Sequence, residues 1–328
     1  MTDALICIGS PLQAICAVEA IAEYKIDQYE FFVIDDGVRL SQIKKFLDER
    51  TIVYTVVPYH IPLWKNILRV INVVNPFIGQ YDLLLMGDYR LSSNRMEYVP
   101  LVKNGGKIVY LDDGTYIVGW AKGLLVETRI TRIRNRIMDI VCGLRGISYK
   151  NLFTMFANDI TMHGYSVRNN TLSQLQMFSK TIGDDIFFIG TTPLGASGYC
   201  THMGIDYDYY LKVLDRLLFD IRRCNPKRHI IYVPHGRDTS KETLNICKRL
   251  RIEYERLPEC VELYALSAKN NPKEIWGFGS TALYTLCKLC KGTKITNVII
   301  QGTNSNSLEE YRWLSIIYSQ NNINNIWV

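Results

Sequence analysis

Short apolar runs alternate along this chain with longer stretches in which hydrophobic positions recur with helical spacing. The short runs have the length and composition of buried strands, and they fall at 4–8, 30–34, 51–56, 81–86, 107–111, 185–189, 229–233, 252–254, 274–277 and 296–300. The longer stretches predict amphipathic helices at 11–24, 40–48, 207–223, 241–250 and 280–290. Apolar strands that alternate with helices are typical of parallel sheets covered on both faces. The pattern therefore predicts an α/β fold.

The alternation is interrupted once, between about residues 117 and 180. This region holds a basic stretch of helical period, an irregular segment and the polar run 168–171. We expect a boundary within 170–182, with one Rossmann-like domain over 1–175 and a second over 176–328. Two such domains facing a cleft form the GT-B type of architecture, in which ligands bind beyond the carboxyl ends of the strands.

The composition agrees with a globular protein of two domains. The chain has 328 residues, of which 48% are hydrophobic and 21% charged, so disorder is not indicated. A net charge of +6 suits phosphate-bearing ligands or an anionic membrane face, but it is too small to indicate nucleic-acid binding. Nine scattered cysteines indicate reduced thiols in a cytosolic protein. The apolar run 4–8 is too short for a signal peptide or a membrane span, so we expect a cytoplasmic protein.

Two acidic turns follow predicted strands. Asp112-Asp113-Gly114 comes directly after the run 107–111, and Asp35-Asp36-Gly37 comes after the run 30–34. In either turn the carboxylates can cap the turn and a following helix, or one of them can serve as a general base held at a strand end. The pattern alone does not separate the two turns.

A histidine leaves the run 229–233 through a proline and just before a glycine. This sharp turn presents the imidazole of His235 next to Arg237, and arginine binds phosphate and carboxylate groups. A lone histidine is more often structural, and we interpret the remaining ones in that way: His60, His163, His202 and His229. The strand-end position and the neighbouring arginine make His235 a candidate functional residue.

Glycine and hydroxyl residues stand at a further strand end. Gly279, Ser280 and Thr281 follow the run 274–277 and open the predicted helix 280–290. Backbone amides and hydroxyls at a helix N-terminus bind phosphate, and serine and threonine are also common helix caps, so the two interpretations are compatible. Glu262 can accept hydrogen bonds from ribose hydroxyls, or it can stand on a solvated helix face.

Three other patterns favour structural interpretations. Asp206-Tyr207-Asp208 spells a metal-binding DxD, but it precedes a long amphipathic stretch and is more typical of a helix start. Cys287 and Cys290 form a lone CxxC, which favours two helix-buried thiols. The segment 9–13 stands where a GxGxxG loop would follow the first strand, which argues against NAD or ATP use.

Together these motifs resemble the bacterial sialyltransferases of GT-B fold, most of all the lipooligosaccharide sialyltransferase family (glycosyltransferase family 52) and the related polysialyltransferases. Those families carry an acidic D/E-D/E-G motif, then a His-Pro motif, then a Ser-Ser/Thr motif. This sequence has Asp112-Asp113-Gly114, His235 and Ser280-Thr281 in the same order. The segments 7–13, 187–194 and 232–283 add to a likeness that covers most of the chain, with 120–170 least matched. Here a proline precedes the histidine instead of following it.

The resemblance selects the turn at 112–113 over the turn at 35–36 and implies a role for each motif. Asp112 would be the general base on the acceptor hydroxyl, with Asp113 as the fallback or as a support of the turn. His235 would be the general acid, or the hydrogen-bond partner, on the departing CMP phosphate. The remaining implied residues are Ser280 and Thr281 for the phosphate, Glu262 for the ribose, Gly190, Thr191, Arg237 and Gly279 for the rest of the donor site, and Ser10 and Gln13 on the acceptor side.

The resemblance thus implies an inverting sialyltransferase that moves a sialic acid from CMP-sialic acid to a surface glycan of the O-antigen, lipooligosaccharide or capsule type. The domain 1–175 would supply the base and the acceptor side, and 176–328 would bind the donor. No cofactor and no metal are expected, because CMP carries a single phosphate. Two alternatives stay open: a transferase for another CMP-nonulosonic or Kdo-type sugar, and a catalytically silent nucleotide-sugar-binding protein.

A basic stretch within the region 120–170 has two interpretations. Its arginines alternate with isoleucines, valine and leucine between 129 and 145, and they are Arg129, Arg132, Arg134, Arg136 and Arg145. The stretch is either a solvated basic helix face packed on the core or a peripheral contact with anionic lipid at the inner face of the membrane. The expected partners are therefore a CMP-sugar, an oligosaccharide acceptor and an anionic membrane surface, with no nucleic acid and with oligomerisation left open.

Overall fold

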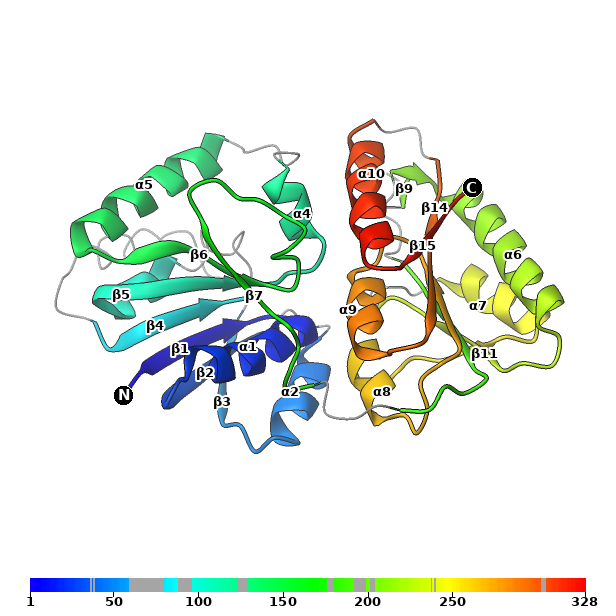
Figure 1. Ribbon diagram of the computed structural model, residues 1–328, viewed down its shortest axis with the longest axis horizontal. Coiled ribbons are helices and arrows are strands. Elements are labelled where there is room, and N and C mark those ends of the chain that lie inside the picture. The colour runs from blue at the N-terminus through cyan, green and yellow to red at the C-terminus, as the bar shows by residue number, and fades with distance from the viewer. Residues whose placement is uncertain are drawn as a thin grey trace. The chain divides into compact units, whose positions relative to one another are not determined.

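The computed structural model describes residues 1–35, 37, 39–58, 79–87, 96–122, 129–175, 180–191, 199–200, 204–236, 238, 240–301 and 305–328. The chain divides into two compact units, Met1–Gln174 (unit 1) and Leu175–Val328 (unit 2). Each unit contains its own parallel sheet with helices on both faces (Figure 1). This is the α/β architecture that the sequence predicts.

In unit 1, the described strands form one parallel sheet in the order β3-β2-β1-β4-β5-β6-β7. The helices α1 and α2 cover one face of this sheet and α5 covers the other (Figure 1). The elements are β1 Asp3–Ile8, α1 Pro11–Tyr24, β2 Gln28–Asp35, α2 Leu40–Asp48, β3 Tyr54–Pro58, β4 Tyr81–Met86, η2 Met96–Leu101, β5 Val102–Leu111, α4 Tyr116–Ala121, α5 Arg129–Arg145, β6 Ser148–Thr154 and β7 Ser166–Asn169.

In unit 2, the main sheet has the order β12-β11-β8-β13-β14-β15, and its described pairs are parallel. The helices α6 and α7 lie on one face, and α8, α9 and α10 lie on the other (Figure 1). The elements are β8 Ile186–Ile189, β9 Tyr199–Cys200, β10 Ile205–Asp206, α6 Tyr207–Cys224, β11 Ile230–Val233, α7 Lys241–Arg249, β12 Glu253–Tyr254, α8 Val261–Ser267, β13 Glu274–Gly277, α9 Thr281–Leu289, β14 Lys294–Ile299, α10 Ser305–Gln320 and β15 Asn324–Trp327.

In both main sheets the strand order reverses at one point. In chain order the first three strands of each main sheet run outward to one side, and the fourth strand starts on the other side of the first. This is the 3-2-1-4-5-6 order of Rossmann folds, and such sheets bind ligands beyond the carboxyl ends of the strands at the reversal. The switch points lie between β1 and β4 in unit 1 and between β8 and β13 in unit 2.

The expected interruption of the alternation is wrong. The strands β6 and β7 extend the parallel sheet of unit 1 through the region 117–180. In β6 only the last four residues are buried, so the apolar signal is half the length of the strand. The short and polar β7 has no buried position, because it is an edge strand. The edge strand β15 escaped prediction for the same reason.

Candidate functional site

The strands around the switch point of unit 1 end at the same level. Cys7 of β1 pairs with Met86 of β4, and Met86 pairs with Tyr110 of β5. The residues that follow these strands therefore meet at one edge of the sheet. They are the segment 9–13 after β1, Gly87 after β4 and the acidic turn 112–114 after β5.

The segment after β1 forms a capped helix start. Ser10 is the N-cap of α1, and its hydroxyl accepts a hydrogen bond from the Gln13 backbone amide at 3.2 Å. Pro11 takes the first helical turn, where its missing amide hydrogen costs nothing. Serine followed three residues later by glutamine is the capping-box pattern. The pattern brings the Gln13 side chain back over the end of β1.

Gln13 is held by both ends of its carboxamide. Its Oε1 accepts a hydrogen bond from the Gly9 backbone amide at 2.7 Å, which leaves Nε2 to donate to Asp113 Oδ1 at 2.9 Å. Only 2% of Gln13 is exposed. A Cβ at Gly87 would lie 2.3 Å from Gln13 Oε1, so any other residue at 87 would push this side chain out of its position. The two acceptor-side candidates and the acidic turn thus form one hydrogen-bonded group.

The two carboxylates of the acidic turn differ in exposure. Asp113 is partly exposed and accepts the bond from Gln13. Asp112 has 0% exposure and points the other way, where it accepts from Thr154 Oγ1 at 2.5 Å and from the Met155 backbone amide at 2.7 Å. Gly114 follows the two aspartates with φ of +76°, a backbone conformation that glycine adopts without strain. Asp112, the residue that the resemblance put first, is therefore the carboxylate without access to a ligand.

Burial also changes the acidity of Asp112. Loss of solvent raises the pKa of this carboxyl from 3.8 to about 7, although the hydrogen bonds from Thr154 and from the Met155 amide act in the opposite direction. The neutral form of Asp112 is therefore stable in the folded protein up to about neutral pH. Thr154 could not be identified as the partner of Asp112 from the sequence, because the strand that carries Thr154 was not predicted.

The other acidic turn, at 35–37, has a structural role in its described residues. Asp35 ends β2, and its Oδ1 accepts a hydrogen bond from the Gly37 backbone amide at 2.8 Å. This is the turn-capping role typical of aspartate before glycine. Asp36 lies outside the described residues.

The strands around the switch point of unit 2 also end in register. Val233 of β11 and Gly277 of β13 both pair with Ile189 at the end of β8. The candidate residues after these strands are thus brought to one edge of the sheet: His235, the pair Gly190 and Thr191, and the group Gly279, Ser280 and Thr281. Arg237 lies outside the described residues.

The turn after β11 approaches the end of β8 closely. The Gly190 amide donates to the Val233 carbonyl at 2.8 Å, and a Cβ at Gly190 would lie 2.5 Å from Tyr232 Oη. The carbonyl of His235 accepts from the Asp238 amide at 2.8 Å, which closes a turn with the imidazole partly exposed. Thr191, which follows Gly190 at the end of β8, is buried. The expected proline-to-histidine turn is therefore present at the strand end.

The third group is a helix start fixed by tertiary contacts. Gly279 has φ of +53°, and its amide donates to Asn297 Oδ1 at 2.8 Å. Ser280 is the N-cap of α9, with its hydroxyl accepting from the Ala282 amide at 3.3 Å and its carbonyl accepting from Tyr318 Oη at 2.9 Å. A helix start held in this way presents backbone amides in a fixed direction, which suits an anion.

Glu262 is buried, so it is not a solvated helix-face residue. It stands in the first turn of α8, and its Oε1 accepts from Thr285 Oγ1 of α9 at 2.9 Å. This bond joins α8 to the helix whose start carries Ser280. By contrast, Asp206 is the N-cap of α6 and accepts from the Tyr209 amide at 3.0 Å, which confirms the helix-start interpretation of the DxD motif.

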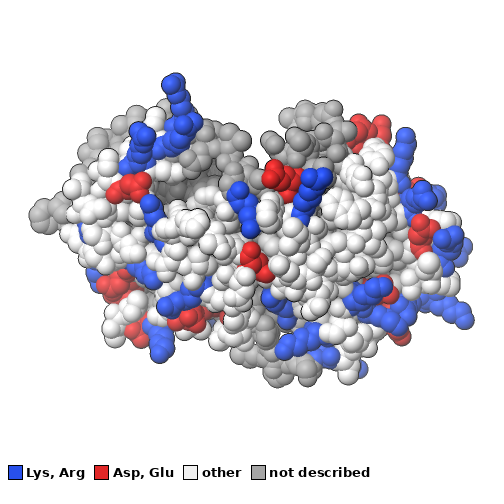
Figure 2. Space-filling model, turned by 45° about the horizontal axis from the view of Figure 1, so that its top comes forward, with Lys and Arg blue, Asp and Glu red and all other residues white. Residues whose placement is uncertain are grey.

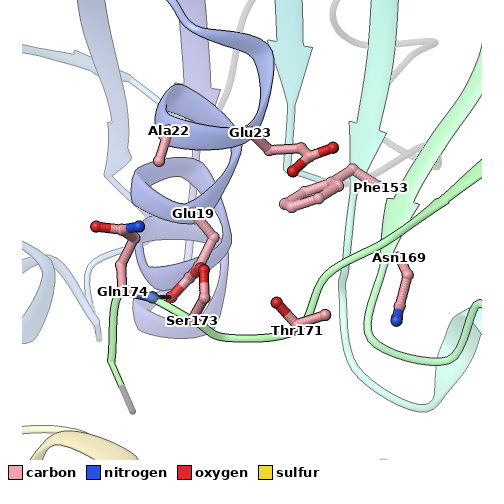
Figure 3. A pocket seen from close by; sticks show the side chains of 8 residues that line it. All are labelled: Glu19, Ala22, Glu23, Phe153, Asn169, Thr171, Ser173 and Gln174. Carbon is pink, nitrogen blue, oxygen red and sulfur yellow. Dashed lines mark hydrogen bonds between the residues drawn. The ribbon is translucent and has the colours of Figure 1, made fainter. Parts of the chain in front are cut away.

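A small pocket of about 130 Å³ in unit 1 contains none of the candidate residues. Figure 3 shows it beside the second half of α1, where Glu19 faces the chain that follows β7. Glu19 is buried and accepts from the Gln174 amide at 2.8 Å and from Ser173 Oγ at 3.3 Å. These bonds fasten the end of unit 1 to α1, which is a structural role.

Comparisons with known proteins give a fold and no sequence family. No family model matches the chain, and no curated protein matches its sequence. Solved structures do match. A 2,6-sialyltransferase from Photobacterium sp. JT-ISH-224, in complex with CMP and lactose, has a TM-score of 0.55 at 10% identity, covering 99% of this chain and 78% of that chain.

Two further structures extend this similarity. An α/β-galactoside α-2,3-sialyltransferase from Photobacterium phosphoreum has a TM-score of 0.53 at 8% identity, covering 99% of this chain and 98% of that chain. Arabidopsis thaliana UGT89C1, in complex with UDP-L-rhamnose, has a TM-score of 0.52 at 8% identity, covering 99% and 85%. The chain therefore has the GT-B fold and resembles bacterial GT-B sialyltransferases, as the sequence predicts.

Among the described helices, none has the length and apolarity that crossing a membrane requires.

Proposed function

We propose that this chain is an inverting glycosyltransferase that moves a sialic acid from CMP-sialic acid to a hydroxyl group of a surface glycan. One observation supports this most: each unit brings a group of polar candidates to its switch point, an acidic turn in unit 1 and the N-terminus of α9 in unit 2. GT-B structures that bind CMP or UDP-sugar ligands share the fold.

In this proposal the roles of the two aspartates are exchanged. Asp113 is the general base, because it is partly exposed and oriented by Gln13. Asp112 is a positioning residue, because its carboxyl is buried and hydrogen-bonded to Thr154 and Met155. A base must reach the proton that it accepts, and a fully buried carboxyl does not.

The chemical step is a substitution at the anomeric carbon of the sialic acid. The acceptor oxygen forms a bond to this carbon and gives its proton to Asp113, while the bond between the anomeric carbon and the phosphate oxygen breaks. The electron pair leaves on the CMP phosphate. His235 donates a hydrogen bond or a proton to that phosphate, and the start of α9 stabilises its charge. Attack on the face opposite the leaving group inverts the centre.

The remaining donor contacts follow the same scheme. Ser280 and Thr281 bind the phosphate, Glu262 binds the ribose hydroxyls, and Gly190 and Thr191 line the donor site at the end of β8. Because the donor has one phosphate, no metal ion is needed to bridge a diphosphate, and turnover should survive EDTA.

The experiment that tests this proposal measures CMP release from CMP-sialic acid, with and without galactoside acceptors. We expect acceptor-dependent CMP release, and His235→Ala should lower its rate by roughly 10²–10³-fold because leaving-group stabilisation is lost. Calorimetric titration with CMP and UDP should show preference for CMP. Tighter binding of UDP would contradict the donor assignment.

Two alternatives give different results in the same assay. Turnover of a Kdo-type or another CMP-nonulosonic donor, but not of CMP-sialic acid, would change the sugar and keep the mechanism. Binding of CMP without turnover of any donor would indicate a silent nucleotide-sugar-binding protein.

A further inference from the structure

The helix α5 exposes a stripe of large apolar side chains. Ile133, Ile140 and Leu144 are 58%, 62% and 77% exposed. Their spacing of seven and then four residues puts them on one side of the helix. Scattered single apolar side chains are common on protein surfaces, whereas an aligned set on one helix marks a contact surface.

The opposite side of α5 is firmly attached to unit 1. Met138, Val141 and Cys142 are buried. Arg145 is buried as well, and its guanidinium donates to the Val99 carbonyl at 3.0 Å and to the Val102 carbonyl at 2.5 Å. Arg145 therefore does not belong to a basic surface, which corrects its inclusion in the basic stretch. The stripe faces outward because the other side of the helix is already packed.

Arginines flank the exposed stripe. Arg129 and Arg136 share its side of the helix, Arg132 lies next to them, and all three are exposed. None of the three forms an ion pair with any residue in the described part of the chain. The neighbouring Asp139 is engaged by Tyr149 and by Lys150 at 3.2 Å, and these contacts lower its pKa. Figure 2 shows Lys and Arg side chains standing out from unit 1, with acidic side chains nearby.

The helix α6 of unit 2 provides a contrast. It also exposes aromatic side chains, Tyr209 and Phe219. Its charges are mixed, however, because Asp208, Asp215 and Asp220 stand among its basic residues. A mixed surface has no preference for an anionic one, whereas on the exposed side of α5 the acidic residue Asp139 is already engaged by Tyr149 and Lys150.

We propose that α5 docks unit 1 on the surface of an anionic phospholipid bilayer. Ile133, Ile140 and Leu144 enter the boundary between headgroups and acyl chains, and Arg129, Arg132 and Arg136 lie against the lipid phosphates. Interfacial helices combine an apolar side with arginine and lysine in this way. The proposal rests on the exposed residues of α5 alone and does not depend on the chemistry at the switch points.

The test is co-sedimentation of the full chain with vesicles of phosphatidylcholine that contain about 30% phosphatidylglycerol. The triple variant Arg129→Gln, Arg132→Gln, Arg136→Gln should lower the partition coefficient by about 100-fold, since each arginine contributes about fivefold near an anionic surface. Ile133→Ser, Ile140→Ser, Leu144→Ser should lower it at least about tenfold. All six side chains are on the surface, so thermal stability should stay unchanged.

A charge-matched control removes three exposed basic residues from unit 2: Lys212→Gln, Arg216→Gln and Lys227→Gln. This variant should sediment with the vesicles nearly as well as the wild type. Three results would overturn the proposal: wild-type protein that stays in the supernatant, a loss in the control as large as in the α5 variants, or α5 variants that turn a dimer into a monomer in light scattering. The last result would make a second copy of the chain the partner of this surface.

Discussion

Unit 1 and unit 2 share the strand order of a Rossmann fold, and both gather their polar candidates where that order reverses. They differ in the groups that they present there. In unit 1 both carboxylates of the acidic turn accept a hydrogen bond from a side chain, Asp113 from Gln13 and Asp112 from Thr154. In unit 2 the contacts involve the backbone, from the Gly190 amide to Val233 and from the Gly279 amide to Asn297.

In the proposed mechanism, this difference lets one topology serve two kinds of chemistry. Side chains that hold each other can orient and tune a titrating group, as a general base requires. Backbone turns fixed against a sheet present amide hydrogens at a constant position, as an anion requires. The fold determines where a site forms, and the side chains or backbone amides that the turns present determine what the site can bind.

The largest expected effect tests the base in unit 1. Asp113→Asn should lower kcat for CMP release by roughly 10²–10⁴-fold, because the variant keeps the bond from Gln13 but cannot accept the acceptor's proton. Its affinity for CMP should match that of the wild type in calorimetry. The matched control is Asp35→Asn, in the other acidic turn, which should retain activity. Equal losses in both variants would argue against a base at 113.

The second effect concerns the buried partner of that base. The pKa of Asp112 is about 7 in the folded protein and near 3.8 when unfolded, so the folded state holds the proton more tightly. This contribution to stability is complete below pH 3.8 and is lost as pH rises toward 7, by about 3 kcal/mol between pH 5 and pH 8.

Asp112→Asn should remove that pH dependence, because asparagine stays neutral. The measurement is urea unfolding of each protein at pH 5 and at pH 8. The change in the free energy of unfolding between the two pH values is compared, so any pH-independent cost of the substitution cancels. A wild type whose stability rises between pH 5 and pH 8, or a variant with the same slope as the wild type, would disagree with a protonated Asp112.

The third effect tests the backbone turn of unit 2. Gly279→Ala should lower kcat/KM on the order of 100-fold, because the added Cβ would lie 2.4 Å from Tyr311 Cε1 and displace the start of α9. The variant should also bind CMP more weakly than the wild type. Gly164→Ala is the control, since this glycine also has a positive φ of +76° but open space around it. If both variants lose the same affinity, backbone strain and not the position of α9 is responsible.

The smallest effect separates orientation from catalysis in unit 1. Gln13→Glu keeps the oxygen that accepts from Gly9 but sets a carboxylate against Asp113. The acid limb of the pH–rate profile should move upward by about one unit, with about a tenfold loss of kcat at the acid end. At high pH the rate should approach that of the wild type, which a merely structural defect would not allow.

Much of the fold could be predicted from the sequence, because the central strands of both sheets are apolar. The bounds of α1 and β4 agree with the predicted ranges, since Ser10 caps the helix and β4 is a central strand. The prediction failed at β6, whose first three residues are not buried, and at the edge strands β7 and β15, which have no buried position. The hydrophobic pattern reflects burial, so edge strands whose faces are exposed to solvent cannot be recognised from it.

For the candidate site, the sequence predicted strand-end positions but not the contacts between them. Gln13 and Asp113 are 100 residues apart, and Asp112 and Thr154 are 42 apart. Spacing in the sequence says nothing about such pairs until the strand order is known. The choice between the neighbouring aspartates also needed the direction in which each side chain leaves the turn.

The close approach of Gly87 to Gln13 has a consequence for how this protein can vary. A methyl group at 87 would occupy the space of the Gln13 carboxamide, so the two positions constrain each other across the switch point. Alanine at 87 alone should be poorly tolerated in a library of variants. Paired with serine at 13 it should fold well while remaining inactive, so selection for stability and selection for turnover would retain different pairs.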